Sequence, residues 1–171
     1  MSDTQGKTPR ETEVIMTHRV LPQDANPAGN LHGGVILKHV DTAGGVVGMR
    51  HCRGNVVTAS IDRMDFLAPA YVGELLTFKA RLNFVGRSSM EVGVRVEAEN
   101  LFTGKVRHTN TCYLTYVALG PDGRPTPAPP LILETDEDRR RHCEAQDRRA
   151  ARKEALRRER AACSGKASDP S

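Results

Sequence analysis

An aspartate, an asparagine and a glycine pair in the first third of the chain have types and spacing suited to acyl chemistry. Asp41 interrupts the apolar stretch 35–47, and a buried ionised carboxylate is costly unless it is paired or put to use. Gly33 and Gly34 stand where a helix should begin, and free backbone N–H groups there can stabilise the oxyanion of an acyl transfer. Asn26 lies in the turn-rich segment just before them. These residues indicate carbonyl activation beside a carboxylate.

The spacing of these groups is too wide for one chain to join them easily. Asp41 lies eight residues beyond Gly33, which is roughly 12 Å along a helix axis. A general base or nucleophile must lie within hydrogen-bond reach of its target. If the helices of two subunits pack antiparallel, the carboxylate of one faces the helix start and the Asn26 loop of the other. We therefore expect a dimer with composite sites.

Hydrophobic periodicity predicts the elements that hold these residues. Apolar residues at helical spacing predict a helix from Gly33 to about residues 51–54: Val35, Ile36, Val40, Ala43 and Val47. Apolar residues with a period of two predict strands over residues 11–21, 55–70 (with Val57, Ala59, Ile61 and Met64 on one face and Pro69 ending it), 74–85, 90–98 and 106–119. Short connections favour an antiparallel sheet, whose concave face must cover the helix. The predicted class is α+β, a curved antiparallel sheet wrapped around one long central helix.

Composition divides the chain into four parts. We expect a disordered N-terminus (1–10), one domain (11–120), a stiff proline-rich linker (121–133) and a charged helical tail with a disordered end (134–171). The tail has acid-to-base pairs four residues apart, such as Glu144 with Arg148 and Glu154 with Arg158, which support a helix. Its few apolar residues predict a helix that is solvated or lightly docked.

Charge and cysteine usage exclude several classes of function. The formal charge is +4, with both signs mixed and no aromatic residues among the basic ones, which argues against nucleic-acid binding. No apolar run is long enough to span a bilayer, and no secretory signal precedes the domain, so we expect no membrane partner. The four cysteines form no CxxC pair and have no metal-ligand spacing. They predict reduced thiols, no metal and a cytoplasmic protein.

Three ordered motifs resemble a known family over residues 13–120. They are PQDANPAGNLHGGVILKHVDTAGGVVGMRHC, VVTASIDRMDFLAPAYVGE and NFVGRSSMEVGVRVEAENLFTGKVRHTNTCYLTYVAL. Together they closely resemble the hotdog acyl-CoA thioesterases of the cytosolic, brain-type acyl-CoA hydrolase group. The resemblance implies hydrolysis of acyl-CoA to free acid and CoA, with no metal or redox cofactor, in trimers of hotdog dimers. The animal relatives have two hotdog repeats per chain and this chain has one, so the expected assembly is a hexamer of single-domain chains.

The resemblance also implies a role for each site residue. The catalytic pair falls on Asn26 and Asp41. The amides of Gly33 and Gly34 would hold the thioester oxygen, and Asn26 would orient the substrate or a water. Asp41 of the partner subunit would activate that water as a general base, or attack first and form a mixed anhydride. The sequence leaves both routes open.

The CoA part of the substrate has its own candidates. The loop of Gly86, Arg87, Ser88 and Ser89 offers a guanidinium, hydroxyls and backbone N–H groups to a phosphate or adenine, although it also reads as an ordinary hairpin turn. Thr58 would line the pantetheine channel, or simply pack within its strand. For the loop and for Thr58, both the role in binding CoA and the purely structural role remain open.

Other interpretations compete with this one. Asp41 could be a structural acid paired with His39 or Arg50, and His32 could fix its loop by a hydrogen bond. A hotdog dehydratase would need a catalytic histidine before a Pro- and Gly-rich loop, which has no counterpart here. A non-catalytic acyl-CoA sensor is a further alternative, and the presence of both Asn26 and Asp41 argues against it.

Overall fold

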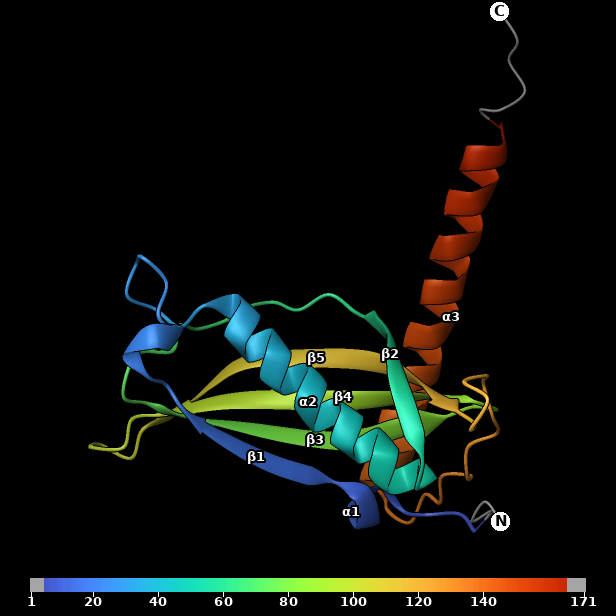
Figure 1. Cartoon of the computed structure of the whole chain (residues 1–171), viewed down its shortest axis with the longest axis horizontal. Coiled ribbons are helices and arrows are strands. Elements are labelled where there is room, and N and C mark those ends of the chain that lie inside the picture. The colour runs from blue at the N-terminus through green and yellow to red at the C-terminus, as the bar shows by residue number, and fades with distance from the viewer. Residues whose placement is uncertain (1–4, 166–171) are drawn as a thin grey trace, which may run out of the picture.

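A five-stranded antiparallel sheet curls around one long helix (Figure 1). The computed structural model describes residues 5–165. Its strands are β1 (Val14–Arg19), β2 (Asn55–Ile61), β3 (Leu75–Val85), β4 (Ser89–Glu99) and β5 (Val106–Leu119), in the order β1-β3-β4-β5-β2. Its helices are α1 (Pro9–Thr12), the short 3-10 helix η1 (Pro22–Asp24), α2 (Gly33–Cys52) and α3 (Asp136–Gly165). The predicted hotdog fold is confirmed, with α2 as the central helix and α3 as the helical tail.

The central helix has the predicted start and the predicted buried face. α2 begins at Gly33 and ends before Arg53, whose φ of 50° is left-handed and closes the helix. Its buried residues are Ile36, Val40, Ala43, Gly44, Val47, Gly48 and His51. A Cβ added at Gly48 would lie 3.1 Å from a methyl group of Val56, so the glycine lets the helix approach the sheet closely. The glycines of this helix therefore serve packing.

Alternating apolar residues on the long strands β3 and β4 form the part of the core that belongs to the sheet. β3 pairs with β4 from Leu75 opposite Glu99 to Val85 opposite Met90, with one bulge. The face toward α2 carries the buried residues Leu76, Phe78, Ala80, Leu82, Met90, Val92, Val94, Val96 and Ala98, as predicted. Each large apolar side chain buried in this way stabilises the fold by about 1.5–3 kcal/mol.

The prediction for the strand after α2 was wrong in its length and its buried face. β2 ends at Ile61, and Val57 and Ile61 are each 41% exposed, whereas Val56 and Ser60 are half-buried. β2 is an edge strand that pairs with β5 alone, and its register shifts between Thr58 and Ser60. A bulge of this kind breaks the strict alternation on which the prediction depended.

The segments at both ends of the domain are more ordered than predicted. Residues 8–10 were expected to be disordered, but Thr8 caps α1 and forms a capping box with Glu11. Residues 1–4 and 166–171, also expected to be disordered, lie outside the described residues. The segment 121–133 does not stand off as a linker: Leu131 pairs with Lys7, and the carbonyl of Pro129 lies 2.7 Å from His51 Nε2. It returns along the domain and covers the end of α2.

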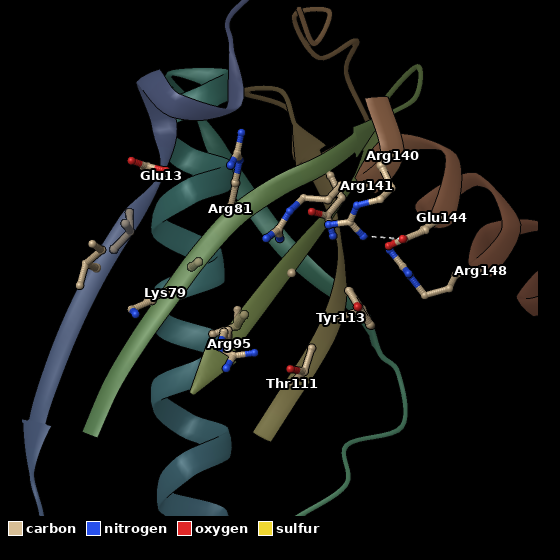
Figure 2. A pocket seen from close by; sticks show the side chains of 16 residues that line it. Glu13, Lys79, Arg81, Arg95, Thr111, Tyr113, Arg140, Arg141, Glu144 and Arg148 are labelled. Carbon is tan, nitrogen blue, oxygen red and sulfur yellow. Dashed lines mark hydrogen bonds and ion pairs between the residues drawn. The ribbon is translucent and has the colours of Figure 1, made fainter. Parts of the chain in front are cut away.

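The C-terminal helix docks on the face of the sheet opposite α2 (Figures 1 and 2). Near its start, Asp138 forms a buried ion pair with Arg81 of β3. Although burial disfavours the charge, hydrogen bonds from Thr135 and the Arg81 guanidinium hold the pKa of Asp138 below its ordinary value. One turn beyond the completely buried Ala145, the side chain of Arg148 bonds Glu91 at 2.7 Å. Docking of the first half is thus stronger than predicted, while the second half is largely exposed.

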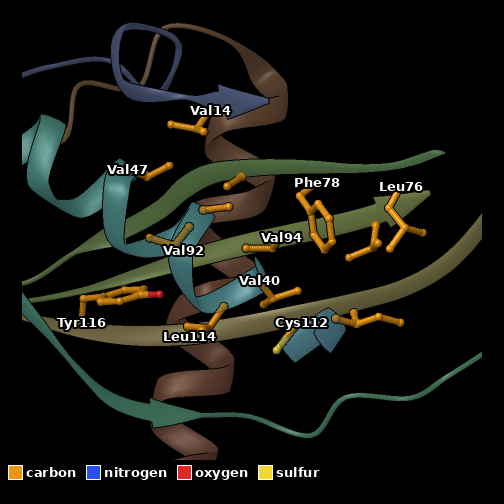
Figure 3. Close-up of a cluster of buried hydrophobic side chains, with 14 of the residues drawn as sticks. Val14, Val40, Val47, Leu76, Phe78, Val92, Val94, Cys112, Leu114 and Tyr116 are labelled. Carbon is orange, nitrogen blue, oxygen red and sulfur yellow. The ribbon is translucent and has the colours of Figure 1, made fainter. Parts of the chain in front are cut away.

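The core lies between α2 and the concave face of the sheet (Figure 3). Val40 and Val47 of the helix are completely buried, as are Val92 and Val94 of β4. Tyr116 is the largest completely buried side chain in this layer and reaches the helix from β5. Within the described part of the chain, no helix has the length and hydropathy to cross a bilayer.

Candidate active site

Asp41 lies half-buried on the side of α2 next to β2, with one carboxylate oxygen held in place. Its Oδ1 accepts a hydrogen bond from Thr58 Oγ1 at 2.7 Å and lies 3.1 Å from the Tyr116 hydroxyl. That hydroxyl also lies 2.8 Å from the main-chain carbonyl of Asp41, to which it donates. The other oxygen, Oδ2, has no hydrogen-bond partner among the described residues. One oxygen is therefore oriented while the second is available to a substrate or water.

The structural pairing that could have explained Asp41 is absent among residues 5–165. The ring of His39 packs against His18, with centroids 4.3 Å apart, and the Arg50 guanidinium donates to the carbonyl of Glu13 at 2.8 Å. Neither side chain bonds Asp41. Its contacts are two hydroxyl groups, which orient a carboxylate without neutralising it.

Sequence reasoning missed Tyr116 as a site residue. Burial and the neighbouring Asp41 carboxylate raise its pKa above the ordinary tyrosine value, so the hydroxyl stays protonated as a donor. The residue opposite this hydroxyl is Gly44, where an added Cβ would lie 2.5 Å from Tyr116 Oη. A glycine is needed at this position for the hydroxyl to reach Asp41. A tyrosine in line with the apolar inward residues Cys112, Leu114 and Ala118 of β5 was the available signal.

We expect Gly44→Ala to destabilise the protein through this contact. Alanine favours the helix by up to about 1 kcal/mol over glycine, but overpacking a core costs about 1–3 kcal/mol, so unfolding in urea should occur at lower denaturant. The control is the same substitution in a Tyr116→Phe background, which lacks the clashing oxygen. There the loss should be smaller, and an equal loss in both backgrounds would contradict this account.

The loop before α2 is fixed by Asp24. Its carboxylate accepts the Leu21 N–H at 2.9 Å and lies 2.9 Å from His18 Nε2, and its main-chain carbonyl accepts the His32 N–H at 2.8 Å. The hydrogen bonds from Leu21 and His18 lower the pKa of Asp24, so the loop is fastened by a charged acceptor. These contacts tie the segment containing Asn26 to β1 and to the start of the helix.

Asn26 is held with its amide group in a defined orientation. Its Oδ1 accepts the N–H groups of Ala28 at 2.9 Å and Asn30 at 3.2 Å. Because both partners are donors, the oxygen must face the turn and the NH₂ group must face away from it. Nδ2 has no hydrogen-bond partner among the described residues. Asn26 thus offers an oriented donor.

The two glycine amides predicted to polarise a carbonyl differ. The Gly34 N–H donates to His32 Nδ1 at 2.9 Å, so His32 caps the helix. This agrees with the interpretation that His32 fixes its loop by a hydrogen bond. The Gly33 N–H has no partner within residues 5–165. Gly33 and Asn26 both line an open groove of about 410 Å³, beside Phe66, which is 56% exposed. Of the two predicted amides, Gly33 is the available donor.

The structure therefore forms two half-sites in one chain. One, at the start of α2, holds the free donors of Asn26 and Gly33, and the other, midway along α2, holds Asp41 with Thr58. The groove at the first half-site is not lined by either residue of the second. The candidate donors and the candidate carboxylate are therefore separated within one chain, as the spacing along a helix predicts.

An uncovered apolar stripe runs through the second half-site. Positions four apart on α2 form it, with Leu37 36% exposed and Met49 45% exposed on either side of Asp41. On β2 next to it, Ile61 is 41% exposed and pairs with the inward-facing Leu114, whereas Val57, also 41% exposed, pairs with Val117 and lies on the other face of the sheet. Apolar side chains gathered on one helix face and one edge strand indicate a surface that is covered by another protein.

The predicted CoA loop forms the hairpin between β3 and β4. The Gly86 N–H donates to the Ser89 carbonyl at 2.7 Å, as in an ordinary turn, while the Arg87 side chain is exposed and has no partner in the described part of the chain. Thr58 pairs across the sheet with Tyr116, and Tyr116 pairs with Met90 at the base of this hairpin. The loop lies two strands from Thr58, about 10 Å away. Thr58, expected to line the pantetheine channel, contacts Asp41.

Comparison with known proteins agrees with this architecture. The model of the thioesterase superfamily matches residues 28–102. An uncharacterized acyl-CoA thioester hydrolase of Bacillus subtilis is 39% identical over 144 residues, which are 84% of each chain. The chain belongs to the acyl-CoA hydrolase family of hotdog thioesterases. A cytosolic acyl-CoA thioester hydrolase of Rattus norvegicus is 35% identical over 80% of this chain, which spans 36% of that longer relative.

Solved structures of the acyl-CoA hydrolase family superimpose closely. An apo-hexameric acyl-CoA thioesterase is 38% identical with a TM-score of 0.86, over 89% of this chain and 97% of that one. A Staphylococcus aureus acyl-CoA hydrolase solved with butyryl-CoA and CoA is 31% identical with a TM-score of 0.85, over 94% and 98%. Three single variants of that hydrolase have also been solved, each with one residue replaced by alanine. The replaced residues are an asparagine, an aspartate 15 positions after it and a threonine 17 positions after the aspartate. Asn26, Asp41 and Thr58 have the same order and spacing.

Proposed function

We propose that this chain is an acyl-CoA thioesterase, which hydrolyses acyl-CoA to a free carboxylic acid and CoA. The observation that carries the proposal is the pair of half-sites, one with free N–H donors and one with an oriented carboxylate. Thioester hydrolysis needs both, because charge develops on the carbonyl oxygen while a water or carboxylate attacks the carbon. Family membership and the matching spacing of Asn26, Asp41 and Thr58 with the substituted residues of the Staphylococcus aureus hydrolase support it.

In this mechanism the Asn26 Nδ2 and the Gly33 N–H hold the thioester oxygen and stabilise the oxyanion. Asp41 either takes a proton from a water that attacks the carbonyl carbon, or attacks that carbon itself to form a mixed anhydride, which a water then hydrolyses to the free acid and the restored carboxylate. Thr58 orients the carboxylate through Oδ1, which leaves Oδ2 for the reaction. CoA leaves as its thiol, and we propose that no metal or redox cofactor takes part.

Two copies of the chain complete each site. We propose that a second copy covers the stripe around Asp41 with its own α2, running antiparallel, so that Asp41 of one copy meets Asn26 and Gly33 of the other. A two-fold axis relates the copies, so each dimer has two equivalent sites. The uncovered apolar residues on α2 and β2 support this arrangement, and the hexameric relative supports a trimer of such dimers.

The remaining features fit a cytoplasmic enzyme with small-molecule substrates, and we propose that location. The hairpin of Gly86, Arg87, Ser88 and Ser89 would contact the CoA phosphates, since the exposed Arg87 is unpaired in the described structure and a guanidinium binds phosphate well. No nucleic acid or membrane partner is proposed.

The test is release of free CoA thiol from acyl-CoAs of short to long chain by the wild-type protein. Turnover of at least one acyl-CoA, with equimolar acid formed, is the expected result. Tight binding of acyl-CoA without turnover across the panel would instead make the protein a sensor and overturn the proposal.

A further inference from the structure

A second cavity lies on the opposite face of the sheet from Asp41, between β3, β4, β5 and the first half of α3 (Figure 2). Its volume is about 340 Å³, at the lower end of the range of about 300–1,000 Å³ for small-molecule sites. The cations that line it come from two strands and one helix: Lys79, Arg81, Arg95, Arg140, Arg141 and Arg148. The carboxylates that line it are Glu13 and Glu144. The lining therefore has six cations and two carboxylates, and the other carboxylates that pair with these cations lie just outside it.

Gly93 is one of the residues that line the cavity. Gly93 lies opposite Arg81 on β3 and opposite Tyr113 on β5. A Cβ added there would lie 2.7 Å from Asn83 Nδ2 and 3.4 Å from the Tyr113 ring. A glycine is therefore needed here to leave room for the side chains of Asn83 and Tyr113, which line the cavity. The next pair on this face of the strands, Lys79 opposite Arg95, places two cations beside them.

Two lining residues have buried polar atoms that lack partners. Asn83 is 2% exposed; its Nδ2 donates to Glu91 Oε1, which can only accept, and its Oδ1 has no partner among the described residues. Arg81 pairs with Asp138 through one amino group, while its Nε, also buried, has no partner in residues 5–165. Buried polar atoms are nearly always hydrogen-bonded in folded proteins. The Arg81 Nε–H is an unpaired donor that suits an anionic ligand, whereas the Asn83 oxygen needs a donor and does not select an anion.

The cations of the cavity are paired with carboxylates, but these pairs do not use all of their N–H donors. Lys79 and Arg95 share Glu97, Arg140 bonds Glu144, and Arg141 bonds Glu137. Each guanidinium has five N–H donors, and a pair with one carboxylate uses one or two of them. Arg148 is the most committed, because it bonds Glu91 and stacks 3.7 Å above the Tyr113 ring. The helix cations, whose side chains extend toward the strands, thus retain donors for an anion (Figure 2).

We propose that this cavity binds a ligand through a diphosphate group, held between the cations of the sheet and those of α3. Several guanidinium groups around one cavity favour phosphate oxygens, which they bind with paired, charge-assisted hydrogen bonds. A diphosphate offers more phosphate oxygens than a single phosphate, for donors on both the strand side and the helix side of the cavity. The site faces away from Asp41 and requires no thioester chemistry, so it stands whether or not the chain is a thioesterase.

The test is calorimetric titration of the full-length oligomer with inorganic pyrophosphate and, separately, with ADP. The variant Arg95→Gln/Arg141→Gln removes one cation from the sheet and one from the helix, both partly exposed, and spares the buried Arg81–Asp138 pair. We expect its dissociation constants to rise by about tenfold or more, since each charge-assisted hydrogen bond contributes substantially. The matched control Arg139→Gln/Arg158→Gln removes two exposed cations of α3 that do not line the cavity, and it should bind as the wild type does.

Other outcomes identify the source of the diphosphate or contradict the proposed site. The diphosphate could belong to a free nucleotide or to CoA itself. A higher KM for acyl-CoA in Arg95→Gln/Arg141→Gln would assign it to CoA, and an unchanged KM with weaker ADP binding would assign it to a nucleotide. The proposal fails if wild type binds neither probe at millimolar concentration, or if Arg87→Gln abolishes binding while Arg95→Gln/Arg141→Gln does not. The cations would then only dock α3.

Discussion

Replacing Asp41 with asparagine should lower the turnover of acyl-CoA by about a hundredfold or more while leaving the protein folded. A hundredfold loss corresponds to about 2.7 kcal/mol of transition-state stabilisation, the scale expected when a general base or nucleophile is removed. Asparagine keeps the shape of the side chain, and its amide oxygen can still accept from Thr58. Tyr116 keeps its contact with the main-chain carbonyl at position 41. The loss should therefore appear in kcat, measured as CoA thiol released.

The control for this substitution is Asp136→Asn on α3. It makes the same chemical change at a carboxylate that is 99% exposed and lies outside both half-sites. Its activity should match the wild type, and both variants should give the wild-type oligomer on a sizing column. An Asp41→Asn protein that keeps full activity would remove Asp41 from the mechanism.

Mixing two inactive variants should restore activity. Asn26→Ala damages the half-site with the donors, and Asp41→Asn damages the half-site with the carboxylate. If each site combines the two half-sites of different chains, a mixed dimer has one intact site and one site with both defects. Random pairing of equal amounts gives mixed dimers half of the time, so about a quarter of the wild-type activity should return. Coexpression or joint refolding, followed by CoA release, measures this.

The control for the mixing experiment is a mixture of Asp41→Asn with Asp41→Ala, which has no chain with an intact carboxylate and should stay inactive. If the Asn26→Ala and Asp41→Asn mixture also stays inactive although mixed dimers form, each site lies within one chain. That result would contradict the composite site while leaving thioesterase activity itself untouched.

The regular part of the fold was predictable because its cause is local. Alternation in β3 and β4 and the helical period of α2 are direct records of which side chains are buried. The bounds of α2 followed from Gly33 at its start and from the polar residues after Cys52. β2 was harder to predict, because on an edge strand with a bulge the apolar residues Val57 and Ile61 are not buried by their own chain.

The site was predictable only in part, since hydrogen bonds between distant residues leave no periodic signal. The sequence indicates Asn26 and Asp41, but not that Tyr116, 75 positions away from Asp41, would touch it. It also could not distinguish Gly34, whose amide is used by His32, from Gly33. The docking of α3 depends on partners such as Glu91 and Arg148, 57 positions apart, so composition alone predicted a helix that is solvated or lightly docked.

The contact of residue 7 with residue 131 sets an order of events during synthesis. Leu131 pairs with Lys7, and the Lys7 ammonium donates to the carbonyl of His51 at 2.8 Å near the end of α2. Because a ribosome delivers the chain from its N-terminus, the central helix and all five strands emerge before the segment that completes this contact. The nascent domain therefore waits with the end of α2 uncovered, and it closes only when the segment around Leu131 has left the exit tunnel.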